Sequence, residues 1–506
     1  MAEWIESLGR PDDHAETVAH HYATAFDYAR STGGDVEPYA ERAGTALREA
    51  GDRALGLHAF TAAARLYRRA LDLSSETDPA RGPLLLKLGR SLFRSEGGGE
   101  AELLSSLAAL RATGDVEGMT EAELFLADLY HTAGKPELYH RHLASATSLA
   151  SELGATSTKA DALVAISADA NRSGDYQQSL AVGREALALI EDLGLDELRV
   201  RALNVIGWAR LETDDERGFA DLERSIEIAS AAGSPMATRG HANIAHHLRH
   251  RGHFKRSLEH LEEAMRLADR FGDVPMGRFL RGILAHNRYR QGRWDDALEA
   301  AGSYLEEVGE SHHTVWHALG TRGLIRLSRG DDGGIEDSDG SIEAARRSVD
   351  PTTLPATLEV RARSLLLAGR HDEAAQAMEE ALAILETGIV RPGFDLAHLV
   401  VMTVELGGDI QRVLAVARPS RWAEAAHHYF AGDFGRAADI YGETGSRTDE
   451  AEARLRSGGA LLAAGRRSEG EAEMARALAF YNEVGATYFV RRAEGLLAAA
   501  GSEIPA

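Results

Sequence analysis

The 506-residue sequence predicts an all-α protein, an α-solenoid in which antiparallel helix pairs stack into a right-handed superhelix. Three observations lead to this fold class. Short turns recur at a nearly constant step along the chain, and apolar residues follow helical spacing between the turns. No sustained run of alternating β-branched residues suggests a strand. A fixed period of this length is typical of repeat arrays, because one helix pair cannot bury its apolar face alone.

The turns define the repeat. Most are centred on glycine, and they lie at Gly134, Gly174, Thr213, Gly252, Gly292, Gly330, Gly369 and Gly407. The step from each turn to the next is nearly the same along this whole series. We therefore expect a repeat array over residues 57–406 with a period of about 39 residues.

Each repeat is expected to contain two helices. After the turn at Gly252, the stretch "FKRSLEHLEEAMRLADRFG" places Phe254, Leu261 and Met265 on one apolar stripe. Gly272 then ends the second helix, as glycine commonly does. Applied along the whole chain, this pattern predicts about 24 helices.

The two ends of the chain depart from the period. Residues 1–56 are helical in pattern but carry no repeat turn, so they are expected to form an N-terminal helical cap. The turn at Gly432 follows Gly407 by much less than one period, and Pro419 disfavours helix in the residue before it. We expect an irregular joint at 407–431, followed by C-terminal repeats and a cap over 432–500.

Composition excludes several classes of function. The formal net charge is −23, which argues against binding to nucleic acid or to an anionic membrane. The absence of cysteine removes disulfides, thiolate zinc sites and cysteine nucleophiles. No apolar run long enough to span a membrane and no signal-peptide pattern occur, so a cytoplasmic protein without a membrane segment is expected.

The repeat motif resembles a known family. The pattern "G-[DRH]-[YFW]-x-x-[AS]-L" followed by "EAL" or "EAM" is similar to tetratricopeptide repeats over roughly residues 57–495. The resemblance implies that the first helix of each pair lines a concave groove. It also implies a non-catalytic scaffold that binds a protein or peptide there.

A second resemblance involves both ends of the chain. The stretches "DHAETVAHHYATAF" and "RWAEAAHHYFAGDFGRAADIYGETGS" resemble actinobacterial signalling proteins. In these, a class III nucleotide cyclase and an AAA/STAND ATPase precede a tetratricopeptide tail. The sequence has no "GxxxxGK[ST]" phosphate loop and no recognisable cyclase context. The resemblance therefore implies the sensor or regulatory tail of such a protein, with the ATPase module in a parent chain.

The stretch "HANIAHHLRHRGHF" contains five histidines: His241, His246, His247, His250 and His253. Histidine is a common metal ligand, and the i, i+4 spacing of His246 and His250 would place two ligands on one helix face. The sequence fixes no third ligand, and no HExxH glutamate is present. We expect groove or packing histidines and no metal, cofactor or catalytic site. A metal-dependent enzyme that uses the His241–His253 cluster is the alternative.

The repeat register also predicts which side chains face the groove. The groove positions are occupied by Asn171, Arg172, Arg239, His246, Arg249, His250, His286, Tyr289, Arg290 and Arg363. Arginine binds carboxylates through two parallel hydrogen bonds, so an acidic partner is expected. In the competing interpretation, some of these arginines pair with acidic residues of adjacent helices and leave the groove neutral.

Overall fold

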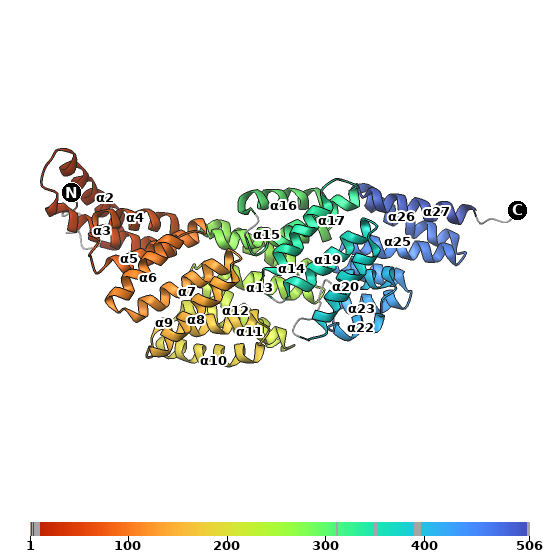
Figure 1. The fold of residues 1–506 in the computed structure, drawn as a ribbon, viewed down its shortest axis with the longest axis horizontal. Coiled ribbons are helices and arrows are strands. Elements are labelled where there is room, and N and C mark those ends of the chain that lie inside the picture. The colour runs from red at the N-terminus through yellow and green to blue at the C-terminus, as the bar shows by residue number, and fades with distance from the viewer. Residues whose placement is uncertain are drawn as a thin grey trace. The chain divides into compact units, whose positions relative to one another are not determined.

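The computed structural model describes residues 2, 4, 11–309, 312–348, 350, 352–388 and 396–502. Over these residues it contains 26 α-helices and no strand (Figure 1). The prediction of an all-α protein built from antiparallel helix pairs is confirmed. The right-handed twist of the array stays a prediction. No helix in the described part of the chain is long and apolar enough to cross a membrane.

The helices are numbered as in Figure 1. Their bounds are α2 Pro11–Ser31, α3 Glu37–Gly56, α4 Phe60–Leu73, α5 Arg81–Glu96, α6 Glu100–Thr113, α7 Val116–Thr132, α8 Pro136–Glu152, α9 Ser157–Arg172, α10 Tyr176–Leu193, α11 Asp196–Glu212, α12 Arg217–Ala231, α13 Ala237–His250, α14 Phe254–Phe271, α15 Val274–Arg290, α16 Trp294–Val308, α17 Val315–Arg329, α18 Gly334–Arg346, α19 Thr353–Leu367, α20 His371–Leu385, α21 Leu396–Leu406, α22 Ile410–Val416, α23 Arg421–Phe430, α24 Phe434–Thr444, α25 Arg447–Ala463, α26 Arg467–Glu483 and α27 Thr487–Ser502.

The predicted turns separate the two helices of successive pairs, from α7–α8 to α21–α22. At seven of these turns the glycine named in the sequence has a positive φ, between 64° and 86°. At the turn without a glycine, Asp214 takes this conformation with φ 61°. A left-handed residue lets the chain leave the first helix and reverse, and aspartate tolerates it better than most residues with a side chain.

The chain forms two compact units. Unit 1 comprises Met1–Asn171, Asp175–Gly240 and Met265–Gly277, and unit 2 comprises Arg172–Gly174, His241–Ala264 and Arg278–Ala506. Within unit 1, small residues let helices approach closely. A Cβ atom on Gly51 of α3 would lie 2.5 Å from Cε1 of Tyr67 on α4, so glycine is required where this pair crosses.

The core of unit 2 joins distant parts of the sequence. One apolar cluster contains Tyr289, Trp294 and Leu324 from α15–α17 together with Leu455 of α25 and Phe480 of α26. Trp294 and Phe480 meet edge to face with ring centroids 6.1 Å apart. The C-terminal helices α23–α27 therefore pack against the array as well as against each other.

The segment predicted as a joint contains the two shortest helices in the described part of the chain. Helix α22 has 7 residues and α23 has 10. Ala417 is extended, and Ser420 accepts a hydrogen bond from the amide of Ala423 to start α23. At the other end, α3 and α4 pack as a pair around residue 57. The division into cap, array and joint stays a prediction.

Candidate partner-binding surfaces

The ten predicted groove residues fall into both units. Asn171 and Arg239 belong to unit 1, and the other eight belong to unit 2. The amide nitrogen of Asn171 donates to the carbonyl of Val205 at 2.9 Å and so links α9 to α11. Asn171 therefore has a structural contact that the register did not predict.

In unit 1, Arg239 lies in the first turn of α13 and is solvent-exposed. The surrounding protein nevertheless displaces water from its guanidinium, which is the main cause that lowers the pKa of Arg239. Asp128 and Asp273 oppose this shift, while Arg94 and Arg201 add to it. Charged groups from several helices thus surround Arg239. We call Arg94, Asp128, Arg201, Arg239 and Asp273 the Arg239 surface.

Two of the arginines on this surface already have partners. Arg94 lies 3.4 Å from Asp273, and Arg201 forms an ion pair with Asp161. Within the described part of the chain, Arg239 forms no ion pair. A guanidinium that is exposed, beside neighbours that are paired, can bind an external carboxylate without first breaking an internal contact.

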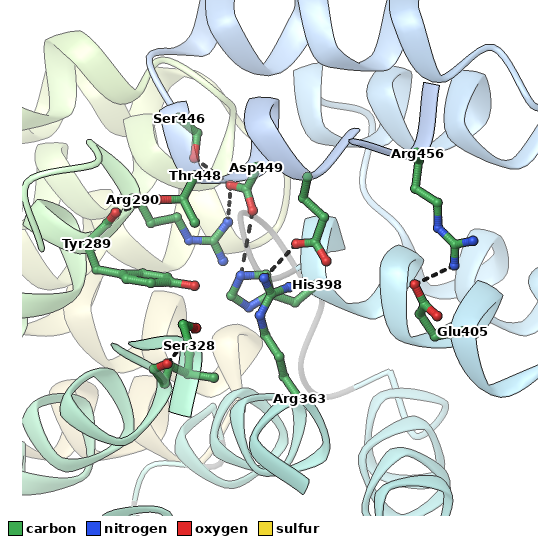
Figure 2. A network of polar contacts seen from close by, with 12 residues as sticks. Tyr289, Arg290, Ser328, Arg363, His398, Glu405, Ser446, Thr448, Asp449 and Arg456 are labelled. Carbon is green, nitrogen blue, oxygen red and sulfur yellow. Dashed lines mark hydrogen bonds and ion pairs between the residues drawn. The ribbon is translucent and has the colours of Figure 1, made fainter. Parts of the chain in front are cut away.

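In unit 2, Arg290 at the end of α15 is completely buried and meets the acidic first turn of α25. Its Nη1 donates to Oδ2 of Asp449 at 2.6 Å, and the carboxylate is only 3 % exposed (Figure 2). Ser446 donates a further hydrogen bond to Asp449. Arg290 and Asp449 lie far apart in the sequence, so this buried pair joins the array to the C-terminal helices.

Arg363 of α19 is bound in the same way. It is 4 % exposed and lies 2.6 Å from the carboxylate of Glu452, one turn after Asp449 on α25. Between the two pairs lies His398 of α21, with Nε2 3.6 Å from Asp449 (Figure 2). Its Nδ1 lies 2.5 Å from Glu359. The nearby carboxylates raise the pKa of Arg363, although burial alone would lower it.

The residues beside this network are also covered. Thr448 donates its hydroxyl hydrogen to the carbonyl of Tyr289 at 2.6 Å. The indole of Trp422 donates to the carbonyl of Arg249 at 2.7 Å. His286 accepts from Nε of Arg290 at 3.2 Å, and burial, followed by the charge of Arg290, lowers its pKa well below the usual range.

These contacts correct the picture of an open arginine-lined groove in unit 2. Five of the predicted residues are at most 6 % exposed: Arg249, His286, Tyr289, Arg290 and Arg363. Arg290 and Arg363 pair with the acidic side chains of Asp449 and Glu452 of the same chain, as the competing interpretation has it for some of the arginines. These two carboxylates are spaced i, i+3 in "SRTDEAEARL" and so share one face of α25, but no repeat position marks them as partners of the arginines.

The docking of the C-terminal helices follows the repeat turns. We call Gly252, Gly292 and Gly330 the docked turns. A Cβ atom placed on each would lie 2.5 Å from Arg421, 2.6 Å from Phe480 and 3.3 Å from Thr487, respectively. Successive turns of the array therefore contact successive pairs of the C-terminal region, and glycine leaves the space for that approach.

His246 and His250, at the end of α13, are half-buried. Their rings stack with centroids 4.2 Å apart and an interplanar angle of 28°. Lone pairs lie in the ring planes, so stacked rings do not direct two nitrogens at one ion. Burial, followed by the charges of neighbouring groups, lowers the pKa of both well below the usual range. Arg172 is also half-buried.

Comparison with known proteins bears on the fold alone. No family model and no curated protein matches the chain. Among solved structures, the chain is similar to a Rap protein complexed with competence and sporulation factor. The TM-score is 0.52 with 15 % identity, over 68 % of this chain and 98 % of that chain. This likeness shows the fold, which is that of a tetratricopeptide-type helical repeat protein.

Proposed function

We propose that the chain is a non-catalytic scaffold that binds a protein or peptide partner, and that the Arg239 surface of unit 1 is the binding site. The observation that supports this most is the difference between the two units. In unit 2, Arg290 and Arg363 form buried ion pairs with Asp449 and Glu452, whereas Arg239 is exposed and forms no ion pair within the described residues. The Rap protein of the similar structure carries a bound factor, which supports partner binding by a fold of this type.

The chemistry of the Arg239 surface favours a partner with a carboxylate. A guanidinium presents two parallel N–H groups to a carboxylate, and such a charge-assisted contact is stronger than a hydrogen bond between neutral groups. Asp128 is also exposed and lies near enough to influence the charge of Arg239. A partner segment that carries an acidic group followed by a basic group would satisfy both. The net charge of −23 disfavours a nucleic acid in this role.

The test uses the full-length chain and an immobilised peptide array that varies acidic and basic residues independently. Replacement of Arg239 with alanine should weaken the binding of the tightest acidic peptide. The expected loss of binding free energy is about 1.5–3 kcal/mol, the usual contribution of a hydrogen bond to a charged group. Arg224→Ala is the matched control, because Arg224 is an exposed arginine that pairs with Glu227 on α12. Equal affinity of wild type and Arg239→Ala for every acidic peptide would contradict the proposed site.

We further propose that the scaffold is the regulatory tail of a cyclase–ATPase signalling protein, or a relative of one. The support is the resemblance of "DHAETVAHHYATAF" and of the C-terminal repeats to that group. The reading frame upstream of Met1 tests this directly, and an AAA/STAND ATPase module there is the expected result. If the neighbouring reading frames encode no such module, the chain is a scaffold of another system.

A further inference from the structure

His241 and His260 meet across one helix pair of unit 2. His241 lies on α13 and His260 on α14, and both are half-buried. Their Nδ1 atoms are 3.0 Å apart, and the ring centroids are 5.1 Å apart at an interplanar angle of 41°. Unlike the stacked rings of His246 and His250, this pair brings two imidazole nitrogens to one point.

The repeat register shows that these two positions form a contact pair. His241 precedes the turn glycine Gly252 and His260 follows it, each at a fixed offset. The same offsets from Gly134 give Glu123 and His142. Both are buried, and Nδ1 of His142 lies 2.6 Å from Oε2 of Glu123. In four other repeats the same offsets give pairs in which neither side chain is ionisable: Leu163 and Val182, Leu319 and Ser338, Leu358 and Ala377, and Leu396 and Ala415. The helix pair therefore holds His241 and His260 in contact by its own geometry.

The distance between the nitrogens limits what the pair can do. If both rings are neutral, one Nδ1–H can donate to the other Nδ1, which is a single hydrogen bond at a half-buried position. Alternatively, one metal ion can accept both lone pairs. Because metal–nitrogen bonds to histidine are about 2.0–2.1 Å long, an ion bound to both nitrogens would see them about 95° apart. This angle suits square-planar or octahedral coordination and is narrower than the tetrahedral angle that zinc prefers, so Ni²⁺ should bind more tightly than Zn²⁺.

We propose that His241 and His260 bind one divalent transition-metal ion of the Ni²⁺ or Zn²⁺ class, with water in the remaining coordination positions. Imidazole nitrogen is a preferred ligand of these ions, and the chain contains no cysteine that would compete for them. The two ligands come from the two helices of one pair, so the bound ion ties α13 to α14. The proposal does not depend on the proposed function, although His241 follows Arg239 on α13.

The experiment is a calorimetric titration of the full-length, metal-free chain with Ni²⁺, repeated with Zn²⁺ and with Mg²⁺. One equivalent of Ni²⁺ and of Zn²⁺ is expected to bind above the background, and Mg²⁺, which prefers oxygen ligands, is not. His260→Gln tests the site, because His260 lies outside the histidine-rich stretch. Loss of the His260 imidazole should lower the affinity for Ni²⁺ by at least roughly 10–100-fold. Loss of an outer-shell partner, which does not touch the metal, typically has an effect of that size.

Two further variants complete the test. His241→Gln should abolish the same equivalent, and His427→Gln, which removes an exposed histidine of α23, should leave it unchanged. Circular dichroism confirms that each variant is folded, and Ni²⁺ should raise the melting temperature of wild type but of neither site variant. The proposal is overturned if wild type binds no equivalent above background, or if His260→Gln and His241→Gln bind Ni²⁺ as wild type does.

Discussion

The buried pair between Arg290 and Asp449 gives the sharpest test of the docking of the C-terminal helices. Replacement of Arg290 with methionine keeps an unbranched side chain but leaves Asp449 as a buried carboxylate without its cation. Arg290 is 0 % exposed and Asp449 3 %. Removal of one partner from a buried ion pair typically costs about 3–5 kcal/mol. We expect the free energy of unfolding of unit 2 to fall by that amount.

The double variant Arg290→Met with Asp449→Leu removes both charges. Replacement of both partners by apolar side chains is often neutral or stabilising. Here Asp449 also accepts a hydrogen bond from Ser446, and that hydroxyl would lose its partner. A buried polar group left unsatisfied costs about 1–3 kcal/mol. This cost is smaller than the roughly 3–5 kcal/mol for a buried carboxylate without its cation. The double variant should therefore be more stable than Arg290→Met alone.

Urea unfolding followed by tryptophan fluorescence measures these differences. Trp294 and Trp422 are at most 2 % exposed, and both contact segments that the pair holds together. Arg466→Met is the matched control, because its exposed ion pair with Glu469 should contribute nothing measurable. The reasoning is refuted if Arg290→Met costs less than about 1 kcal/mol, or if the double variant is no more stable than the single one.

Three further outcomes are expected, each measured by urea unfolding. Thr448→Val should cost about 0.5–1.5 kcal/mol, because the carbonyl of Tyr289 loses one of its two buried donors and keeps the indole of Trp294; no measurable loss would count against the contact. Gly292→Ala should cost more than Gly369→Ala: both turns have positive φ, but only the Cβ atom at 292 would meet another side chain, at 2.6 Å. Burial holds the pKa of His317 well below its usual range, so below about pH 6.5 the unfolded chain binds a proton that the folded chain does not. The free energy of unfolding should therefore fall as the pH falls. His317→Gln should reduce its change with pH by up to about 1.4 kcal/mol per pH unit. An unchanged pH dependence between pH 5 and 7 would contradict the lowered pKa.

The fold was predictable because it depends on neighbours in the sequence. Each helix pair packs on the next, so the turn at Gly252 and the stripe of Phe254 and Leu261 carry the same information as their counterparts one period away. Even the turn without a glycine follows the rule, because Asp214 can adopt the left-handed conformation. The apolar period thus predicted helix pairing without any knowledge of distant contacts.

The candidate site depends on contacts that no period contains. The register placed Arg290 and Arg363 on positions suited to acidic side chains, and in the structure both bind carboxylates. It could not identify Asp449 and Glu452 as the acids, since a repeat pattern describes only interactions between adjacent units. The same limit applies to His241 and His260: the histidine-rich stretch was visible, but its contact with the next helix was not.

The irregular step in the sequence near residue 420 keeps the docking of the C-terminal helices regular. Arg421 and Arg447 contact the docked turns Gly252 and Gly292, although the two arginines are much closer in the sequence than the two glycines are. The distance between the axes of stacked helices depends on the side chains at their contact and not on how long the helices are. Helices α23 and α24, with 10 and 11 residues, therefore advance the stack by one pair, as a full repeat does. Short helices change how far the pair projects from the stack, while each pair still meets its own turn of the array. A segment that looks truncated in the sequence can thus still place each C-terminal pair against its own turn of the array. Insertion of residues within α23 should therefore be tolerated less at its docked N-terminal end than at its C-terminal end.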